Sequence, residues 1–122
     1  MSGTEFLADT NAIIYLLKGN ACMKPYLDTR IALSVISYME LLSFSGITQQ
    51  EERSIRAFAG MCRMLPIDNT IIEQTIKLRR QYRIKLPDAI IAATALSYEL
   101  PLITADSGFD RIDELKVERL LQ

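Results

Sequence analysis

The 122-residue sequence contains no histidine and only two cysteines, Cys22 and Cys62. Zinc sites are usually built from histidines and paired cysteines, and neither cysteine belongs to a CxxC pair, so a zinc centre is not expected. Two isolated cysteines also cannot form the dense disulfide framework of a small secreted protein. We expect both as free thiols in the core, which is typical of cytoplasmic proteins.

An excess of positive charge is also missing, because 14 basic and 15 acidic residues give a net charge of −1. The molecule as a whole therefore does not attract nucleic acid, and any such binding needs a local basic cluster or a metal ion. The start of the chain lacks the basic and apolar regions of an export signal. Apolar stretches are far shorter than the ~20 residues that cross a bilayer, so no membrane association is expected.

The sequence does have the composition of an ordinary globular protein, with 49% hydrophobic residues. The chain is long enough for a substantial core, and it contains no internal repeat, low-complexity run or linker. We therefore predict one domain over residues 1–122. Short apolar runs bounded by polar or turn residues predict strands at 5–8, 31–35, 64–67, 100–104 and 116–120.

Segments with the apolar spacing of helices separate these strands. Strands that alternate with helices indicate a parallel sheet covered on both faces, so we predict a three-layer α/β/α fold with a mostly parallel central sheet. Pro66 suggests that the third strand lies near an edge of the sheet, and Thr48 with Glu51 matches a capping box. The predicted helices span 12–18, 37–44, 49–63, 69–83 and 87–96, with a turn or short helix at 108–112.

The helix predicted at 87–96 carries one carboxylate, Asp88, on an otherwise apolar surface. Pro87 suits the first turn of a helix, where Asp88 also meets the positive end of the helix dipole. Ile91 and Ala92, three and four residues further on, share the face of Asp88 and are typical core residues. A buried carboxylate without a partner is unfavourable. We therefore infer that Asp88 shares a cation with other carboxylates.

Three more acids have comparable positions. Asp9 and Asp106 each follow a predicted strand, and Glu40 lies among apolar residues of the helix predicted at 37–44. The carboxyl ends of parallel strands meet at one edge of a sheet, so all four acids can converge there. Clustered carboxylates repel one another unless a cation intervenes, and Mg²⁺ or Mn²⁺ prefers oxygen ligands. Such an ion can activate water for attack on a phosphodiester.

Each acid also has a purely structural explanation. Asp9 can cap the helix that follows it, Asp88 can act only as a partner of the helix dipole, and Asp106 can be a turn residue. Glu40 is the hardest to explain in this way, because its apolar sequence neighbours leave it little solvated room.

Short polar residues and a basic run adjoin these positions. Thr10, Asn11 and Thr104 can hold a metal-bound water or orient the acids beside them, or they can serve only as turn residues. The basic residues of segment 77–85 can contact a nucleic-acid backbone or form an ordinary solvated helix face. The predicted contacts are Arg79, Arg80, Arg83 and Lys85.

Four motifs contain these acids and follow one another along the chain. They are Leu7-Ala8-Asp9-Thr10-Asn11, Ser37-Tyr38-Met39-Glu40-Leu41, Leu86-Pro87-Asp88-Ala89-Ile90-Ile91-Ala92-Ala93-Thr94-Ala95, and Leu102-Ile103-Thr104-Ala105-Asp106 with Phe109. Together they resemble the PIN domain family, and most closely the VapC-type toxins of bacterial and archaeal toxin–antitoxin pairs. The resemblance covers nearly the whole chain; each motif alone is weak, and the four together are specific.

This resemblance implies a ribonuclease that hydrolyses RNA phosphodiester bonds with Mg²⁺ or Mn²⁺. It also implies a homodimer that is inhibited by a small antitoxin protein. Asp110 is left outside the metal ligands, because the spacing after the last motif differs from that of many relatives. The residues implied for catalysis and metal binding are Asp9, Glu40, Asp88 and Asp106, with Asn11 and Thr104 in support.

Two other functions are compatible with the same acids. The first is a PIN-like module that binds protein or RNA without turnover. The second is a phospho-acceptor signalling domain, which also clusters acids on a parallel sheet but needs a lysine beside them. Lys116 is the only lysine after Asp88, and nothing in the sequence marks it as an active-site residue.

Overall fold

A computed structural model describes residues 4–121 and contains a central sheet. Its strands are β1 (Glu5–Ala8), β2 (Arg30–Ser34), β3 (Arg63–Leu65), β4 (Leu102–Thr104) and β5 (Val117–Arg119). They lie in the order β3-β2-β1-β4-β5, and every neighbouring pair is parallel. The predicted parallel sheet and the edge position of β3 are thus confirmed. Of the segment expected to lack an export signal, residues 1–3 lie outside the described residues.

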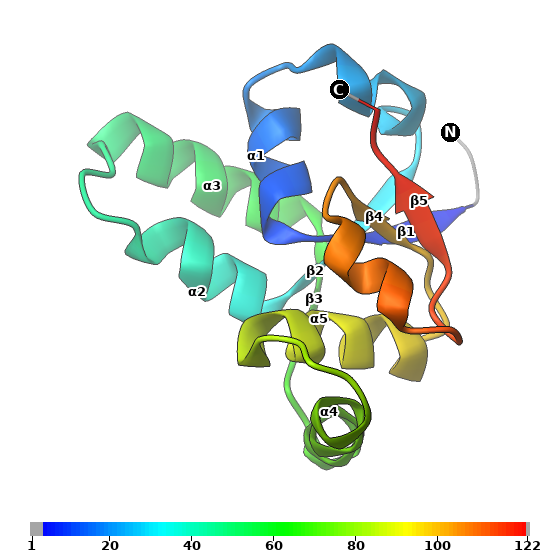
Figure 1. Ribbon diagram of the computed structural model, residues 1–122. Coiled ribbons are helices and arrows are strands. Elements are labelled where there is room, and N and C mark those ends of the chain that lie inside the picture. Colours follow the sequence, from blue (N-terminus) through cyan, green and yellow to red (C-terminus); the bar gives the residue numbers. More distant parts are fainter. Residues whose placement is uncertain (1–3, 122) are drawn as a thin grey trace.

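Helices cover both faces of the sheet. They are α1 (Thr10–Leu17), η1 (Ala21–Tyr26), α2 (Val35–Ser43), α3 (Gln49–Met61), α4 (Asn69–Gln81), α5 (Leu86–Ser97) and η2 (Ser107–Arg111). The first four pack on one face and the last three on the other, which is the predicted three-layer arrangement (Figure 1). Of the helices within residues 4–121, η1 alone was not predicted, because this 3-10 segment contains Pro25 and one buried residue, and so lacks an apolar period. No helix within residues 4–121 is long and apolar enough to cross a membrane.

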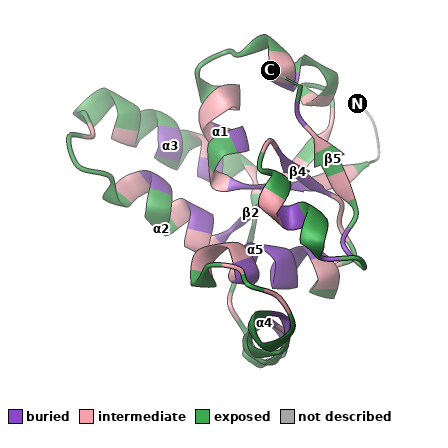
Figure 2. Cartoon of the chain, viewed as in Figure 1, coloured by how far each residue is buried: buried purple, intermediate pink, exposed green. Residues whose placement is uncertain are grey.

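Apolar side chains point from the strands into both helical layers, because successive residues of a strand face opposite sides of the sheet. Leu7 and Leu102 are buried against α4 and α5, whereas the next residues, Ala8 and Ile103, are buried against the other layer. Figure 2 shows buried residues along the central strands and on the inner sides of the helices. Burial on both faces explains why these strands read as continuous apolar runs in the sequence.

Side chains cap the starts of several helices. The Thr48 hydroxyl accepts a hydrogen bond from the Glu51 N–H, and the Glu51 carboxylate accepts one from the Thr48 N–H, so the predicted capping box is confirmed. Asp68 caps α4 in a similar way. Helix α5 differs, because its cap position, Lys85, offers no side-chain hydrogen bond.

The register of the sheet brings acidic positions to one edge. Ala8 of β1 lies opposite Ile103 of β4, so the next residues, Asp9 and Thr104, face each other where the two strands end. Helix α1 begins directly at this edge, immediately after β1. Ligands of open parallel sheets bind outside the carboxyl ends of the strands, so this edge is the expected position of a functional site.

The two cysteines are free thiols, as predicted, but they are only partly buried and do not lie in the core. Cys22 belongs to η1, and Cys62 follows α3. Burial raises the pKa of the Cys62 thiol to about 11, so this thiol is protonated at neutral pH.

Candidate active site

Asp9 is the most buried of the four predicted acids, with 5% of its surface exposed. It follows β1 and caps α1, because its Oδ1 accepts a hydrogen bond from the Ala12 N–H at 2.8 Å. Its Oδ2 accepts a second hydrogen bond from the Thr104 hydroxyl at 2.5 Å. The capping role suggested by the sequence is therefore present, and it fixes the orientation of the carboxylate.

Thr104 connects Asp9 to Asp106. While its hydroxyl donates to Asp9, it accepts a hydrogen bond from the Asp106 N–H at 2.9 Å. The exposed Asp106 carboxylate in turn caps η2, where Oδ1 accepts from the Gly108 N–H at 2.8 Å. A Cβ added at Gly108 would come within 3.1 Å of this oxygen, so glycine suits the position. Thr104 thus contacts the Asp9 carboxylate and the backbone of Asp106, and its supporting role stays a prediction.

Glu40 lies on α2 and is exposed, which corrects the expectation that this acid has little solvated room. Apolar neighbours in sequence are not neighbours in space on a helix, and Met39 beside it is itself 47% exposed. The Glu40 carboxylate accepts a hydrogen bond from the Thr10 hydroxyl at 2.7 Å. Glu40 is therefore tied to the first turn of α1, immediately after Asp9.

Ser37, for which the sequence predicted no role, is fully buried beside this pair, with its hydroxyl oxygen 3.1 Å from that of Thr10. A carboxylate can only accept, so Thr10 donates its single hydroxyl hydrogen to Glu40 and accepts one from Ser37. This series of hydrogen bonds joins α2 to α1. A signal was available in the sequence, because Ser37 precedes Glu40 by three residues and so shares its side of the helix.

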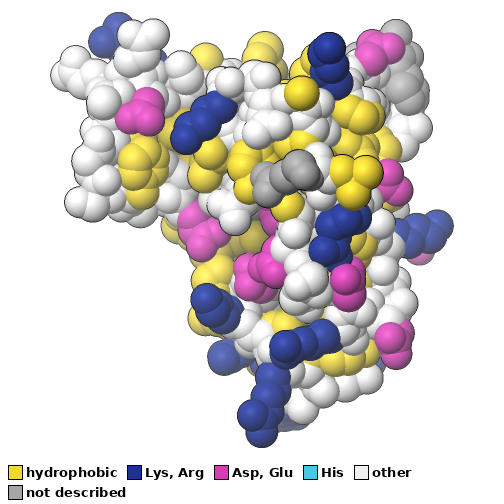
Figure 3. Space-filling model, turned by 45° about the horizontal axis from the view of Figure 1, so that its top comes forward, with side chains coloured by type: hydrophobic (Ala, Val, Ile, Leu, Met, Phe, Trp, Pro, Cys, Tyr) yellow, Lys and Arg dark blue, Asp and Glu magenta, His cyan; other side chains and the backbone are white. Residues whose placement is uncertain are grey.

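Asp88 lies half-buried in the first turn of α5. Burial raises the pKa of its carboxyl, and the negative charges of Asp106 and Glu40 raise it further, whereas Lys85 acts in the opposite direction. These effects mean that residues from three separate segments share one electrostatic environment. Figure 3 shows acidic side chains gathered around a hollow in the middle of one face of the molecule, with Lys and Arg side chains below them.

Asp9 belongs to the same environment. Burial raises the pKa of its carboxyl; its hydrogen bonds with Thr104 and Ala12 lower it, and the charges of Asp106 and Asp88 raise it again, with a net upward shift. The charged form of Asp9 is thus disfavoured despite two good hydrogen bonds. A positive charge beside Asp9 would relieve this unfavourable state.

The chemistry of this acidic cluster suits a hard divalent ion, because Asp9, Glu40, Asp88 and Asp106 all offer carboxylate oxygens. None of them forms an ion pair with a basic side chain of residues 4–121. Within the same residues, however, no three acidic, cysteine or histidine side chains stand close enough together to coordinate one ion. The exposed Glu40 and Asp106 side chains would therefore have to turn toward Asp9 for an ion to bind.

The basic residues predicted to contact nucleic acid fall into different places. Arg83 and Lys85 border a hollow that Asp88 and Asp106 also line. Arg79 lines an adjoining hollow together with Arg83 and Lys85. Arg80 lines a separate hollow on the outer side of α4. Only part of the basic run therefore adjoins the acidic cluster.

Three further residues, Asn11, Asp110 and Lys116, lie beside or away from the acidic cluster. Asn11 is exposed in the first turn of α1. Asp110 forms an ion pair with Arg119. Lys116 comes just before β5, and its carbonyl accepts from the Leu102 N–H at the amino end of β4, so it lies at the opposite edge of the sheet. A phospho-acceptor site built on Lys116 is therefore not supported.

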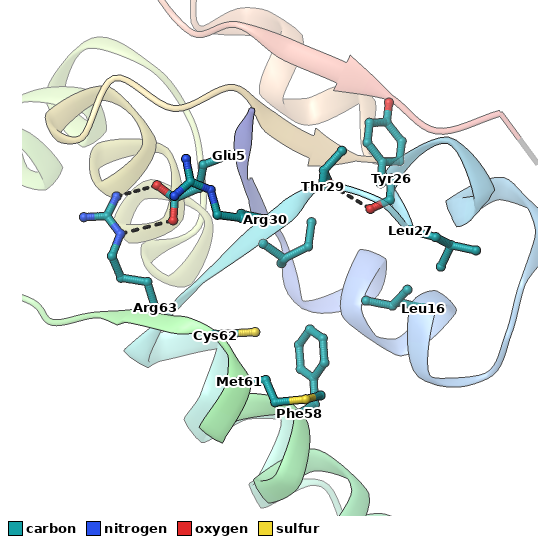
Figure 4. Close-up of a pocket in the computed structure, with 11 residues that line it drawn as sticks. Glu5, Leu16, Tyr26, Leu27, Thr29, Arg30, Phe58, Met61, Cys62 and Arg63 are labelled. Carbon is teal, nitrogen blue, oxygen red and sulfur yellow. Dashed lines mark hydrogen bonds and ion pairs between the residues drawn. The ribbon is translucent and has the colours of Figure 1, made fainter. Parts of the chain in front are cut away.

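A larger hollow, of about 680 Å³, lies away from the acids (Figure 4). It opens beside the first residues of β1, β2 and β3, at the amino edge of the sheet. Its apolar lining includes Leu16 of α1, Leu27 after η1 and Phe58 of α3. An ion pair between Glu5 and Arg63, with 2.7 Å between the charged atoms, borders it. This amino-edge hollow is therefore distinct from the acidic cluster.

Comparison with known families agrees with this geometry. The model of the PIN domain family matches residues 6–115. The chain therefore belongs to the PIN domain family, which places it among nucleases. A search of the curated proteins found no match.

Solved structures narrow the resemblance to VapC-like toxins. One chain of a toxin–antitoxin complex from Klebsiella pneumoniae is 33% identical in sequence to this chain. The two superpose with a TM-score of 0.79 over 93% of this chain and 95% of that chain. VapBC-1 from nontypeable Haemophilus influenzae is 28% identical, with a TM-score of 0.80 over 95% of this chain and 98% of that chain. VapBC2 from Rickettsia felis, bound to a promoter DNA fragment, is 22% identical and shares the fold, with a TM-score of 0.84 over 97% and 100% of the two chains.

Replacing Asp88 by Asn should stabilise the metal-free protein around neutral pH. An acid with a raised pKa binds its proton more tightly in the folded state, so its contribution to stability is present below its unfolded pKa of about 3.9 and is lost as pH rises through the raised value. The amide mimics the protonated acid at every pH. Allowing for solvent screening, we expect the free energy of unfolding to rise by about 0.5–1 kcal/mol around neutral pH, which raises the melting temperature by a few degrees.

Thermal unfolding in a chelator, followed from acid to neutral pH, measures this difference. The gap between Asp88→Asn and the parent protein should be near zero in acid and should grow as the pH rises. The matched variant Asp113→Asn changes an exposed acid outside the cluster and should show no such gain. A gap for Asp88→Asn that is constant with pH would contradict the electrostatic explanation.

Proposed function

We propose that this PIN domain is a ribonuclease that uses Mg²⁺ or Mn²⁺ to hydrolyse RNA phosphodiester bonds. The observation that carries the proposal is the acidic cluster, in which four carboxylates lie near one another and none forms an ion pair within residues 4–121. Nucleic acid and clustered carboxylates are both negative, so a cation between them makes their contact favourable. The absence of histidine leaves these acids as the candidate groups for handling protons and metal.

In this proposal each acid has its own task. Asp9, held on both oxygens, is the fixed ligand, and Asp88, Asp106 and Glu40 complete the set from their own segments. Thr104 keeps Asp9 in place and links it to the backbone of Asp106. When bound, the divalent ion supplies the positive charge that activates water and stabilises the charge developing on the phosphate.

The test compares hydrolysis of single-stranded RNA by the purified chain and its variants in Mg²⁺ or Mn²⁺. Asp9→Asn and Asp88→Asn should each lower kcat/KM by at least about 100-fold, because each removes a ligand charge while it keeps the side-chain shape. Thr104→Val, which removes the hydrogen bond to one oxygen of Asp9, should lower kcat/KM about 10–100-fold. Asp113→Asn should retain full activity.

Full activity of Asp88→Asn, or of the parent protein in excess chelator, would refute this mechanism. RNA binding without turnover in any divalent metal would instead favour the alternative of a binding module. Circular dichroism of each inactive variant should match the parent protein, so that loss of activity is not loss of fold.

We also propose an antitoxin protein as the partner of this chain, because the similar solved structures include toxin–antitoxin complexes from several bacteria. The amino-edge hollow offers it an apolar surface, with Met61 82% exposed and Leu27 65% exposed. Exposed apolar patches of this kind commonly mark protein interfaces. In the cytoplasm, where RNA is available, such a partner would keep the nuclease in check.

Met61→Glu tests this surface, because it would place a charge against the apolar side of the partner. Its affinity for a candidate antitoxin, taken as a small protein encoded next to this chain if one is found there, should fall at least about tenfold by titration calorimetry. Met64→Glu is the matched control, since Met64 lies on β3 outside the hollow. Equal loss in both variants, or in neither, would argue against docking at the amino-edge hollow.

A homodimer is the third part of the proposal. Ile72 and Ile76, one turn apart on the outer side of α4, are each 42% exposed and offer an apolar contact for a second copy. Light scattering should give twice the chain mass for the parent protein and the chain mass for Ile76→Lys. Leu121→Lys, at another exposed apolar residue, should remain dimeric. A monomeric parent protein would contradict this part alone.

A further inference from the structure

A small hollow of about 280 Å³ adjoins the acidic cluster at the carboxyl edge of the sheet. One part of its lining is acidic, from Asp88 and Asp106, and another part is basic, from Arg83, Lys85 and Arg111. Arg83 and Lys85 belong to the segment between α4 and α5, whereas Arg111 ends η2. We call Arg83, Lys85 and Arg111 together the basic wall. Arg111 could not be predicted from the sequence, because only the fold brings it next to Arg83.

The basic wall is held in place by hydrogen bonds to the backbone. Arg111 donates from Nη1 to the carbonyl of Arg83 at 2.8 Å. On the α4 side, Arg79 donates from Nε to the carbonyl of Ile84 at 3.3 Å. The short segment between α4 and α5 is thus fastened by guanidinium groups from two different helices. Its position relative to the acids is set before any ligand binds, which reduces the ordering cost of binding.

The residues of the basic wall form no ion pair within the described part of the chain, although the charge of Lys85 lowers the pKa of Asp88. The ion pairs there involve Arg56, Arg63 and Arg119, and none includes a residue of the basic wall. Arg111 uses one donor for the Arg83 carbonyl and has four N–H groups left, and Lys85 makes no capping hydrogen bond. Three available cations around one hollow are suited to an anion with several oxygens.

The size and lining of the hollow indicate which anion fits. Its volume lies at or below the lower limit of drug-sized ligand pockets, about 300–1,000 Å³, so it suits one phosphate with part of its sugar. Among residues 4–121, the aromatic side chain that lines it is that of Phe109, which is buried and so offers no stacking platform for a base. We propose that the basic wall binds the RNA phosphate next to the one cleaved at the acidic cluster. This inference rests on the proposed function.

Such a subsite would position the strand without reading its sequence, because phosphate contacts fix register and carry no base information. Arg83, Lys85 and Arg111 are therefore positioning residues. They also place positive charge beside four carboxylates that would otherwise repel the RNA backbone. Arg80, which lines the separate hollow on α4, should contribute less than any of these three.

The test measures binding, so that it does not depend on turnover. A short fluorescein-labelled single-stranded RNA of mixed sequence is titrated in Mg²⁺ with the Asp9→Asn protein, and Arg83→Gln, Lys85→Gln and Arg111→Gln are added singly. Each should weaken binding about threefold to tenfold and reduce the slope of log Kd against log salt by roughly 0.7. Arg111→Lys, which keeps the charge and loses the planar fork, should fall between Arg111→Gln and the parent.

Arg53→Gln is the matched control, since Arg53 is exposed on α3 and borders none of the hollows described above. If Arg111→Gln does not fold, Lys85→Gln still tests the basic wall. Unchanged Kd and salt slope in Arg83→Gln and Lys85→Gln would overturn the inference, even if the parent protein cleaves RNA. Normal RNA binding with weakened antitoxin binding would also overturn it, because the hollow would then hold an acidic protein segment. The expected losses in a protein that never cleaves RNA would show that the basic wall binds a phosphate, but would refute the proposed function and the position of that phosphate next to a cleaved one.

Discussion

The structure depends on one buried carboxylate, that of Asp9, and on the two hydrogen bonds that hold it. A carboxylate with so little exposure is unfavourable unless its oxygens are satisfied. One partner comes from its own helix and the other from Thr104 on the neighbouring strand. The second bond requires β1 and β4 to be parallel and in the register that places Asp9 opposite Thr104. The parallel pairing of β1 and β4 is therefore needed both for the sheet and for the orientation of the Asp9 carboxylate.

The remaining acids repel Asp9 and one another at this edge of the sheet, which lowers the stability of the folded chain when no cation is bound. Asp88 and Asp106 raise the pKa of Asp9, and Asp106 and Glu40 raise that of Asp88. Lys85 partly offsets this effect at Asp88, but no ion pair within residues 4–121 joins these acids to a basic side chain. A sequence selected only for stability would pair these charges or replace them. Acidic and basic groups kept side by side without ion pairs are typical of a surface arranged for a ligand, where stability is lower than it could be.

The sequence predicted the layers well and the site in part. Apolar alternation and spacing located the strands and helices because both faces of the sheet are buried, as Leu7 with Ala8 and Leu102 with Ile103 illustrate. Asp9 was predictable because it ends a strand. The exposure of Glu40 was mispredicted, because adjacency in sequence says little about which side of a helix meets the core. The contact between Arg111 and Arg83 was not predictable at all, since it depends on how η2 docks beside α5.

The structural and chemical explanations of these acids turn out to be compatible. Asp9 caps α1 and Asp106 caps η2, and in each case the hydrogen bond that starts the helix also fixes the carboxylate. Each capping bond engages one oxygen, and every carboxylate oxygen has a further lone pair for another partner. A cap is thus an efficient way to pre-orient an acid at the end of a strand. Substitution by alanine would remove the cap and the charge together, whereas substitution by asparagine can keep the cap and remove only the charge, so only the second separates folding from chemistry.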